Sequence, residues 1–345
     1  MSDAELAERP SLADFSQNEH AFPRIVMMGL RRGGKSSICQ VVFHSMQPLD
    51  TLYIESTTTP TTSVFSSFID FAVVELPGQI NYTEAMIDAD RIFANCGALI
   101  YVIDSQDEYT NSLANLHTII LHAINANPTI DIEIFIHKVD GLSDDFRLDV
   151  QRDITQRVTD ELLDDGILNI AIAFHLTSIF DHSIYEAFSR VVQKLIPQLA
   201  TLENLLNVLC QHSGIEKAFL FDIGSKIFVA TDSSPMDIPT YEICTDFIDI
   251  TVDLNSLYTV DRRKPNSAGQ AGQAGQGVKD EHRQPARPIG STSRLSNGVI
   301  LYLQQMVKGL ALVCLMRKES MPKIALVEYN IDFFRDALEQ LWLLG

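Results

Sequence analysis

The sequence predicts an α/β fold over residues 22–199, in which helices cover both faces of a mostly parallel β-sheet. Short apolar runs alternate there with amphipathic segments, which is the pattern of repeated β-strand and α-helix units. A glycine-rich turn joins the first apolar run to a helix-compatible stretch, and polar residues follow each later run. Because ligands bind at the carboxyl ends of strands in such sheets, we expect these polar segments to surround one site.

The strands of this domain are expected where the apolar runs lie. These runs predict strands over residues 24–28, 68–74, 98–103, 133–136 and 170–176. The preceding residues 1–21 are polar, and we predict that they are disordered.

A different pattern follows residue 199 and predicts a second, α+β domain over residues 200–345. Its expected helices span residues 202–212, 241–254 and 331–343, and its expected strands span residues 218–222, 226–231, 298–304, 309–316 and 323–328. Within it, an insert at residues 261–294 repeats Ala-Gly-Gln three times and has too few apolar residues to fold. The insert is basic, so a solvated loop and a weak contact with an anionic membrane or partner both remain open.

The composition excludes several classes of protein. A formal charge of −19 argues against a general nucleic-acid binder, whose surface would be basic. The five cysteines are widely spaced without a C-x-x-C pair, which indicates buried thiols in a reducing compartment and not a zinc site. We find no secretory signal, membrane-spanning run or lipidation motif, so we expect no direct membrane anchor, and any membrane association must come through a partner.

Residues 29–36 match the P-loop pattern G-x-x-x-x-G-K-[ST] at every fixed position. In such a loop the glycines turn backbone N–H groups toward phosphate oxygens, and the following helix presents its positive end to the same anion. Lys35 is expected to reach the terminal phosphates, and the Ser36 hydroxyl is expected to ligate Mg²⁺. The sequence therefore predicts binding of a nucleoside triphosphate or diphosphate.

Two further loops fit the same site. Glu75, Gly78 and Gln79 follow a predicted strand and resemble the D-x-x-G-Q element of small GTPases, in which the glutamine orients the attacking water. Residues 137–140 resemble the guanine-specificity motif N-K-x-D, with histidine in the first position. A carboxylate there can accept from the guanine edge, and a lysine stem can pack over the purine. Alone, these segments are typical of a turn and a solvated loop, but their position relative to the P-loop favours the nucleotide interpretation.

Together these motifs resemble the Rag GTPases, and in particular their RagC/RagD-type subunit, in a fungal-like form. The resemblance extends from about residue 22 to the C-terminus apart from the insert, and it is carried by residues 30–37, 52–57, 137–145, 176–179 and 214–222. It implies a P-loop Ras-like GTPase domain over residues 22–199, followed by a roadblock/longin-like domain over residues 200–345.

The resemblance also implies partners and a location. Family members form an obligate heterodimer with a RagA/RagB-like GTPase through the C-terminal domain. A scaffold complex holds them at the cytoplasmic face of the lysosomal or vacuolar membrane. There they signal amino-acid sufficiency to the TORC1 kinase complex, and a GTPase-activating protein stimulates their slow GTP hydrolysis.

By motif match, the resemblance implies GTP or GDP with Mg²⁺ as ligands and assigns a role to each site residue. Phosphate contacts are expected from Gly29, Arg31, Arg32, Gly33, Gly34, Lys35, Ser36 and Ser37, and base contacts from His137, Lys138 and Asp140 with Ser178 nearby. Ser36, Thr57 and Glu75 are expected to hold the metal, Gly78 to contact the γ-phosphate and Gln79 to be catalytic.

Two departures from the family pattern leave alternatives open. Glu75 stands where the family has aspartate, and the altered segment 57–62 does not decide among Thr57, Thr58 and Thr59 as the switch I threonine. A guanine-nucleotide switch with activator-dependent hydrolysis accounts for every strand-end loop. A nucleotide-binding scaffold with negligible hydrolysis remains an alternative because of Glu75. Asp140 argues against a third possibility, an ATP-dependent kinase.

Overall fold

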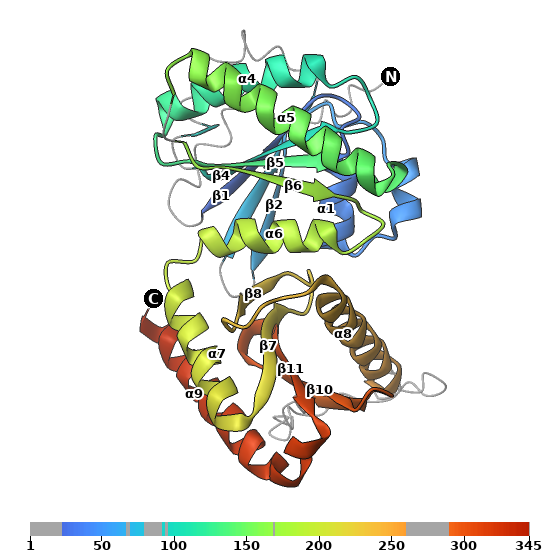
Figure 1. The fold of residues 1–345 in the computed structure, drawn as a ribbon, viewed down its shortest axis with the longest axis vertical. Coiled ribbons are helices and arrows are strands. Elements are labelled where there is room, and N and C mark those ends of the chain that lie inside the picture. The colour runs from blue at the N-terminus through green and yellow to red at the C-terminus, as the bar shows by residue number, and fades with distance from the viewer. Residues whose placement is uncertain are drawn as a thin grey trace, which may run out of the picture. The chain divides into compact units, whose positions relative to one another are not determined.

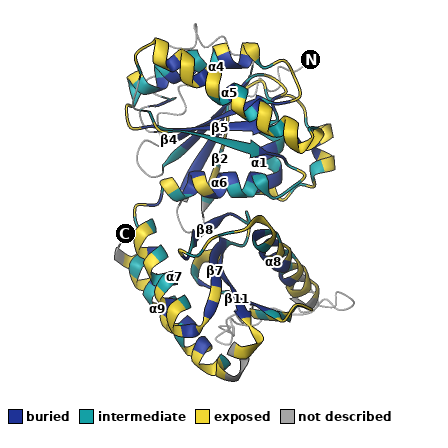
Figure 2. Cartoon of the chain, in the orientation of Figure 1, coloured by how far each residue is buried: buried dark blue, intermediate teal, exposed yellow. Residues whose placement is uncertain are grey.

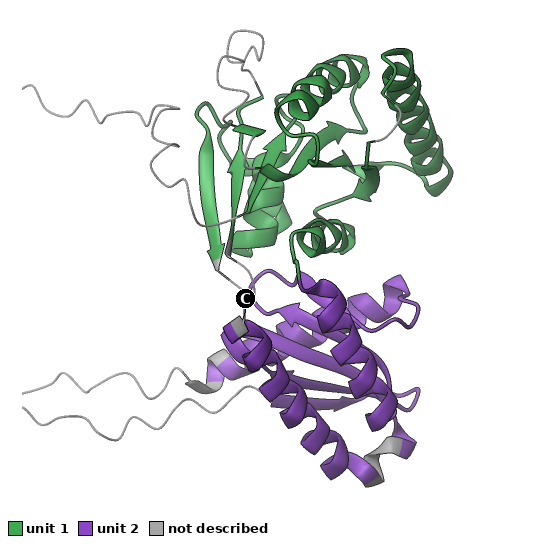
Figure 3. Cartoon of the chain, turned by 90° about the vertical axis from the view of Figure 1, so that its left-hand side faces the viewer, with its two compact units in different colours: residues 1–197 green, residues 198–345 purple. Residues whose placement is uncertain are grey.

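The computed structural model describes residues 23–66, 70–78, 92–93, 96–167, 170–259 and 290–344. The chain divides into two compact units, residues 1–197 and residues 198–345, which are coloured separately in Figure 3. No helix in the described part of the chain is long and apolar enough to cross a membrane. Residues 1–21, which we expected to be disordered, lie outside the described residues, and so does most of the basic insert.

The first unit is built on one six-stranded sheet in the order β2-β3-β1-β4-β5-β6 (Figure 1). Its strands are β1 (Arg24–Met28), β2 (Thr61–Ser66), β3 (Asp70–Glu75), β4 (Cys96–Asp104), β5 (Asp131–His137) and β6 (Ile172–Thr177). Neighbouring strands run parallel except β2, which is antiparallel to β3. The predicted, mostly parallel sheet is confirmed, but β2 was not predicted, because a short polar edge strand has no apolar run to mark it.

Helices cover both faces of this sheet. One face carries α4 (Thr110–Ala126) and α5 (Asp144–Asp164), and the other carries α1 (Lys35–His44) and α6 (Ser183–Lys194) (Figure 1). Short 3₁₀ segments, η2 (Pro48–Tyr53) and η4 (Val139–Gly141), lie in two of the connecting loops. The central strands are buried on both faces, as Figure 2 shows for β4 and β5. Their sequences are therefore continuous apolar runs.

The parallel register brings the strand ends to one edge of the sheet. Glu75 at the end of β3 pairs with Met27 near the end of β1. His137 at the end of β5 pairs with Asp104 of β4 on one side and with Thr177 of β6 on the other. Polar residues that are far apart in the sequence therefore meet where the P-loop leaves β1.

The second unit is an α+β domain with an antiparallel sheet in the order β8-β7-β11-β10-β9. Its elements are α7 (Leu199–Ser213), β7 (Ile215–Asp222), β8 (Phe228–Thr231), α8 (Ile238–Thr259), β9 (Gly290–Arg294), β10 (Val299–Gln305), η6 (Val307–Gly309), β11 (Leu310–Arg317), η7 (Lys318–Lys323) and α9 (Ile324–Leu344). Figure 1 shows α7 and α9 on one face of the sheet and α8 on the other. The predicted α+β class of this domain is confirmed, and the arrangement is that of a roadblock-like domain.

Two predicted elements of the second unit differ from the structure. The expected strand at residues 323–328 is wrong, because α9 begins at Ile324 and occupies that stretch. Val327, Ile331, Phe334 and Leu338 are buried at helical spacing on one face of α9, and this long stripe outweighs the short apolar run at its start.

The predicted C-terminal boundary of the disordered insert, residue 294, is also wrong, because residues 290–294 form β9. This strand has the sequence Gly-Ser-Thr-Ser-Arg, which contains no large apolar side chain. Backbone pairing with β10, from Gly290 opposite Gln304 to Arg294 opposite Ile300, specifies the strand instead. Composition alone does not reveal such pairing.

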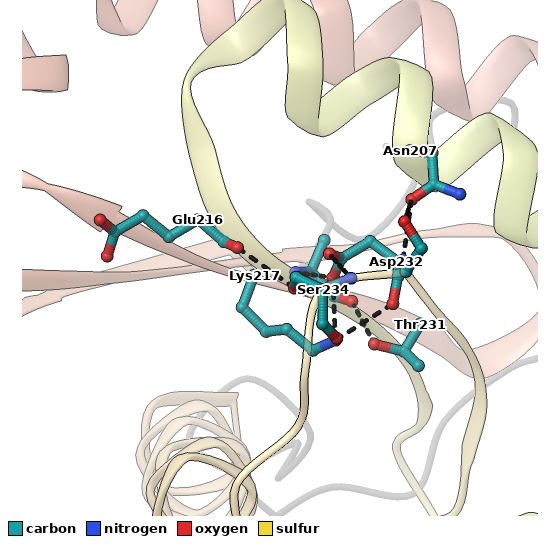
Figure 4. Close-up of polar contacts among 8 residues, drawn as sticks. Asn207, Glu216, Lys217, Thr231, Asp232 and Ser234 are labelled. Atoms are coloured by element: carbon teal, nitrogen blue, oxygen red, sulfur yellow. Dashed lines mark hydrogen bonds and ion pairs between the residues drawn. The ribbon is translucent and has the colours of Figure 1, made fainter.

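A buried ion pair fixes the turn that leads into α8 (Figure 4). Lys217 of β7 and Asp232, which follows β8, are each about 5% exposed, and Lys217 Nζ lies 3.2 Å from Asp232 Oδ1. The ammonium also donates to the carbonyl oxygens of Asp232 (3.1 Å) and Ser234 (2.7 Å). Burial alone would raise the pKa of Asp232, but N–H donors from Ala218 and Ser234 and the charge of Lys217 lower it overall. The turn is thus fixed by paired, hydrogen-bonded groups.

A second contact ties the same turn to α7. Asn207 Oδ1 accepts hydrogen bonds from the backbone N–H and the hydroxyl of Ser233, both at 2.8 Å. The start of α8 is therefore fixed relative to both β7 and α7.

Candidate functional site

The P-loop follows β1 and requires glycine at two positions. Gly29 and Gly34 have φ angles of +137° and +104°, which side-chain-bearing residues rarely adopt. A Cβ atom at Gly29 would lie 2.4 Å from the carbonyl oxygen of Val102, and one at Gly34 would lie 2.6 Å from a ring carbon of His137. Helix α1 begins at Lys35, immediately after this turn, so its N-terminal N–H groups face the loop.

Lys35 lies inside the loop that precedes it. Its side chain is 6% exposed, and its ammonium donates to the carbonyl oxygens of Gly29 (2.8 Å) and Leu30 (3.1 Å). Burial lowers the pKa of Lys35, and the nearby carboxylate of Glu75 acts in the opposite direction. A lysine in this position offers a cation to an anion bound in the loop.

The three residues predicted to hold a metal lie in mutual contact. Ser36 Oγ donates to Glu75 Oε1 at 2.5 Å and lies 2.8 Å from Thr57 Oγ1. Thr57 Oγ1 also donates to Glu75 Oε1, at 3.2 Å. Thr58 and Thr59 are exposed, so this geometry favours Thr57 as the switch I threonine.

The segment after β3 packs directly against the P-loop. A Cβ atom at Gly78 would lie 2.3 Å from the backbone nitrogen of Arg31, so only glycine permits this approach. Arg31 in turn donates from Nη2 to Ser56 Oγ at 3.4 Å, which connects the P-loop to the residue before Thr57. Gln79, the predicted catalytic residue, lies outside the described residues.

Lys138 connects the loop after β5 to the P-loop. Its ammonium donates to Asp104 Oδ2 (2.5 Å) and to the carbonyl oxygen of Arg32 (2.9 Å). The backbone carbonyl of Lys138 accepts from Gln106 Nε2 at 2.7 Å, and the amide of Gln106 also packs where a Cβ atom of Gly141 would lie. The sequence did not single out Gln106, because a backbone contact across 32 positions leaves no local motif.

The carboxylate of Asp140 is held from the loop after β6. Asp140 Oδ1 accepts a hydrogen bond from Ser178 Oγ at 2.7 Å. The same hydroxyl accepts from the backbone N–H of Phe180 at 3.1 Å, and the backbone N–H of Ser178 donates to Ser183 Oγ at 2.9 Å. Two of the residues predicted at the base, Asp140 and Ser178, therefore lie in direct contact.

His137 is buried between three parts of the site. Its ring is 1% exposed, its Nδ1 lies 3.0 Å from Thr177 Oγ1, and its other edge faces Gly34. Burial, assisted by the positive charge of Lys138, lowers the pKa of His137 to about 4, so the ring is neutral near pH 7. Its observed contacts are to β6 and the P-loop, which makes it a spacer between the phosphate and base loops.

These loops surround a cavity of about 690 Å³, a size typical of ligand sites. The lining residues are Arg31, Arg32, Gly34, Lys35, Ser36, Ser37, Thr51, Leu52, Ile54, Glu55, Ser56, Thr57, Glu75, Gly78, Gln106, His137, Lys138, Asp140, Ile179 and Phe180. Gly29, Gly33 and Ser178 are not in this lining. Phe180 is an apolar lining residue that the sequence did not single out, because an apolar residue in a loop carries no motif of its own.

Comparison with known proteins places the chain in a family. A model of the Gtr1/RagA G protein conserved region matches residues 24–248. The chain belongs to the Gtr/Rag family of G proteins. As a Gtr/Rag protein it is a GTPase that binds guanine nucleotides.

Among its Gtr/Rag relatives the chain is similar to GTP-binding protein GTR2 of Saccharomyces cerevisiae, with 55% identity covering 92% of each chain. It is 51% identical to GTP-binding protein gtr2 of Schizosaccharomyces pombe, over 92% of this chain and 98% of the relative. It is also 47% identical to human Ras-related GTP-binding protein C, over 94% of this chain and 77% of the relative. The predicted resemblance to the RagC/RagD-type subunit is therefore confirmed.

The buried, neutral state of His137 predicts a pH-dependent stability of the first unit. Below pH 6.5 the histidine of the unfolded chain takes up a proton, whereas in the folded chain it stays neutral until about pH 4. Lowering the pH from 6.5 toward 4 should therefore lower the unfolding free energy, and the loss should be about 2 kcal/mol at pH 5. We expect His137→Asn to remove this pH-dependent part of the unfolding free energy. Urea titrations at pH 7.5 and pH 5, followed by hydrogen exchange in peptides from β4 and β5, measure it. The same pH dependence in both proteins would contradict a neutral, buried ring.

Proposed function

We propose that the first unit is a guanine-nucleotide switch whose cavity binds GTP or GDP together with Mg²⁺. The supporting observation is that three independent groups meet at one edge of the sheet. These are the P-loop with Lys35, the oxygen cluster of Ser36, Thr57 and Glu75, and the paired Asp140 and Ser178. The first two suit the phosphates and their metal, and the third suits a base.

The residues at the phosphate end fit this ligand. The P-loop leads directly into α1, whose N-terminal N–H groups would face the phosphates, and Lys35 lines the cavity. The metal donors would be two hydroxyls and one carboxylate, all oxygen, which is the donor type that Mg²⁺ prefers beside phosphate. When bound, Mg²⁺ would neutralise phosphate charge.

The residues at the base end favour guanine. The carboxylate of Asp140 is an acceptor for the N1–H and exocyclic amine of guanine, and adenine has no such pair of donors on that edge. Ser178 fixes the orientation of this carboxylate, and the stem of Lys138 is held by its ammonium contacts to Asp104 and Arg32. A site built in this way distinguishes the two bases by hydrogen bonding.

We expect GTP and GDP to bind far more tightly than ATP, because ATP leaves the carboxylate of Asp140 without its donors. Asp140→Asn should reduce this preference by about 4 kcal/mol or more, close to the full discrimination that such a site provides. Competition titrations with GTP, GDP and ATP on the full-length chain measure it, with Asp145→Asn on α5 as the control. Equal affinity of the unsubstituted chain for GTP and ATP would rule out the guanine assignment.

We further propose that hydrolysis is slow on its own and is stimulated by an activating protein, with Gln79 orienting the attacking water. An arginine supplied from a second protein raises such rates by about 10³ to 10⁵. The alternative is a scaffold with negligible hydrolysis, which the glutamate at position 75 keeps open.

Gln79→Leu separates these alternatives. We expect it to abolish most of the stimulated turnover and to leave GDP affinity nearly unchanged, because the side chain would act on water and not on the bound nucleotide. Single-turnover phosphate release with and without the activating protein measures the effect. Stimulated turnover that survives the substitution would assign water positioning to another group, and no stimulation of the unsubstituted chain would favour the scaffold.

We infer that the second unit forms a heterodimer with a RagA/RagB-like GTPase. Relatives of that type also align with this chain, for example Ras-related GTP-binding protein A of Dictyostelium discoideum at 28% identity over 207 residues. Helix α8 exposes Ile243, Ile250, Leu254 and Leu257 at spacings of seven, four and three residues, which gives one apolar stripe. An exposed stripe of this kind is typical of an interaction face.

The same heterodimer would carry the signalling function. We propose that it docks on a scaffold complex at the cytoplasmic face of the vacuolar or lysosomal membrane and reports amino-acid sufficiency to the TORC1 complex. Family membership supports this proposal.

We expect the double substitution Ile250→Glu and Leu254→Glu to abolish pairing, because it places two charges in the apolar stripe. Co-purification with the RagA/RagB-like subunit, membrane recruitment and TORC1 output should be lost together, while GDP binding persists. Leu163→Glu, at a comparably exposed leucine on α5, is the matched control and should change none of these. Stoichiometric pairing of the double variant would show that the dimer contact does not lie on α8.

A further inference from the structure

We propose that Gln106 is a positioning residue for base recognition, and that Gly141 is a glycine because it leaves room for the side-chain amide of Gln106. The amide holds the backbone of Lys138, two residues before Asp140. The inference rests on the proposed function, because it concerns the base end of the same cavity. Gln106 acts through the loop and not on the base itself.

The backbone of Lys138 has a conformation that its surroundings must specify. Its φ angle is +64°, in the left-handed region that residues with a side chain rarely adopt. Such a conformation persists where several contacts hold it, and it is common at functional sites. The ammonium of Lys138 is held by Asp104 and by the carbonyl oxygen of Arg32, but these contacts act at the far end of a flexible side chain. The peptide group of Lys138 needs a contact of its own.

Gln106 supplies that contact. Its Nε2 donates to the carbonyl oxygen of Lys138 at 2.7 Å. The backbone N–H of Gln106 donates to Asp104 Oδ1 at 3.0 Å, and Asp104 Oδ2 accepts from the ammonium of Lys138 at 2.5 Å. The three residues therefore form a closed ring of hydrogen bonds, in which Gln106 fixes the backbone of Lys138 and Asp104 fixes its side chain.

The rest of the loop is held from α5. Arg147 Nε donates to the carbonyl oxygens of Val139 (2.9 Å) and Leu142 (3.1 Å), which lie before and after Asp140 in the chain. None of these three contacting residues lines the cavity, whereas Gln106 does. A nucleotide in the cavity would therefore shield the Gln106 hydrogen bond from water. Because a shielded hydrogen bond is stronger, we infer that this bond contributes most when the nucleotide is bound.

The space for the amide depends on Gly141. A Cβ atom at this position would lie 2.4 Å from Gln106 Nε2 and 2.9 Å from its Cδ. Gly141 does not have a positive φ angle, so its backbone conformation does not itself require glycine. The nearest atoms all belong to the flexible end of one side chain, so an alanine would displace the amide and leave the loop backbone in place. Gly141→Ala therefore removes the hydrogen bond while Gln106 is still present.

The first experiment measures the affinities of the full-length chain for GDP and ADP by competition with a fluorescent GDP analogue. Gln106→Ala should lower the GDP affinity by about fivefold, the usual effect of losing one hydrogen bond. The ratio of GDP to ADP affinity should fall by about the same factor, because Asp140 recognises guanine and not adenine. Gln106→Met keeps the length of the side chain without its donor and should match Gln106→Ala. Gln156→Ala, at an exposed glutamine of α5, is the control and should change neither affinity.

The second experiment combines the two substitutions. Gly141→Ala should lower the ratio of GDP to ADP affinity as much as Gln106→Ala does. The double variant should show no further loss, because the hydrogen bond is already absent and the amide that the new methyl group would displace has been removed. Gly224→Ala is the matched control, since the nearest atom to its new Cβ, Asp222 Oδ2, would lie 3.5 Å away.

The outcomes separate this inference from the proposed function. An unchanged GDP to ADP ratio in Gln106→Ala, or additive losses in the double variant, would overturn the inference even though the chain binds GDP. Equal losses of GDP and ADP affinity would also overturn it, because they would indicate a loosening of the whole site and not of the base loop. Equal affinity of the unsubstituted chain for GDP and ADP would instead contradict the guanine site itself.

Discussion

The path of the P-loop backbone is the constraint on which the rest of the site depends. The loop turns through two glycines with positive φ, and each of the surrounding segments then packs on it. The backbone of Gly78 approaches Arg31, the ring of His137 fills the space beside Gly34, and the ammonium of Lys138 caps the carbonyl of Arg32. A side chain at Gly29 would therefore clash with the backbone of β4, and one at Gly34 would clash with the ring of His137.

The charge balance of the site differs from that of the chain. The formal net charge is −19, yet the lining of this cavity contains four cations, Arg31, Arg32, Lys35 and Lys138, against three carboxylates, Glu55, Glu75 and Asp140. Two of them are held in place by backbone carbonyls, and Lys138 is also paired with Asp104. Fixed cations in a concave wall concentrate field lines on an anionic ligand even when the rest of the surface repels it. The acidic composition thus limits what else the chain binds, while the cavity keeps its affinity for phosphates.

Much of the fold and site could be predicted because the P-loop and the strand-end loops carry their chemistry in contiguous residues. Strands buried on both faces read as apolar runs, and each parallel strand brings its polar end to the same edge. Contacts between distant backbone segments could not be read in this way. Gln106 donates a hydrogen bond to the backbone carbonyl of Lys138, 32 positions later in the chain. Strands β2 and β9 likewise form because a neighbouring strand pairs with them. The start of α9 was misread as a strand because its short apolar run hides a longer helical stripe.

Residue identity alone also could not fix the roles of His137 and Thr57. A histidine after a strand can be a solvated base, but here β6 and the P-loop enclose it, and burial lowers its pKa to about 4. Thr57, Thr58 and Thr59 are chemically identical, and only the fold brings one of them within 2.8 Å of Ser36. In both cases the side chain acquires its role from a segment more than 20 positions away. Residues of the same type therefore acquire different roles from the segments that the fold brings beside them, and the sequence alone does not reveal which segments these are.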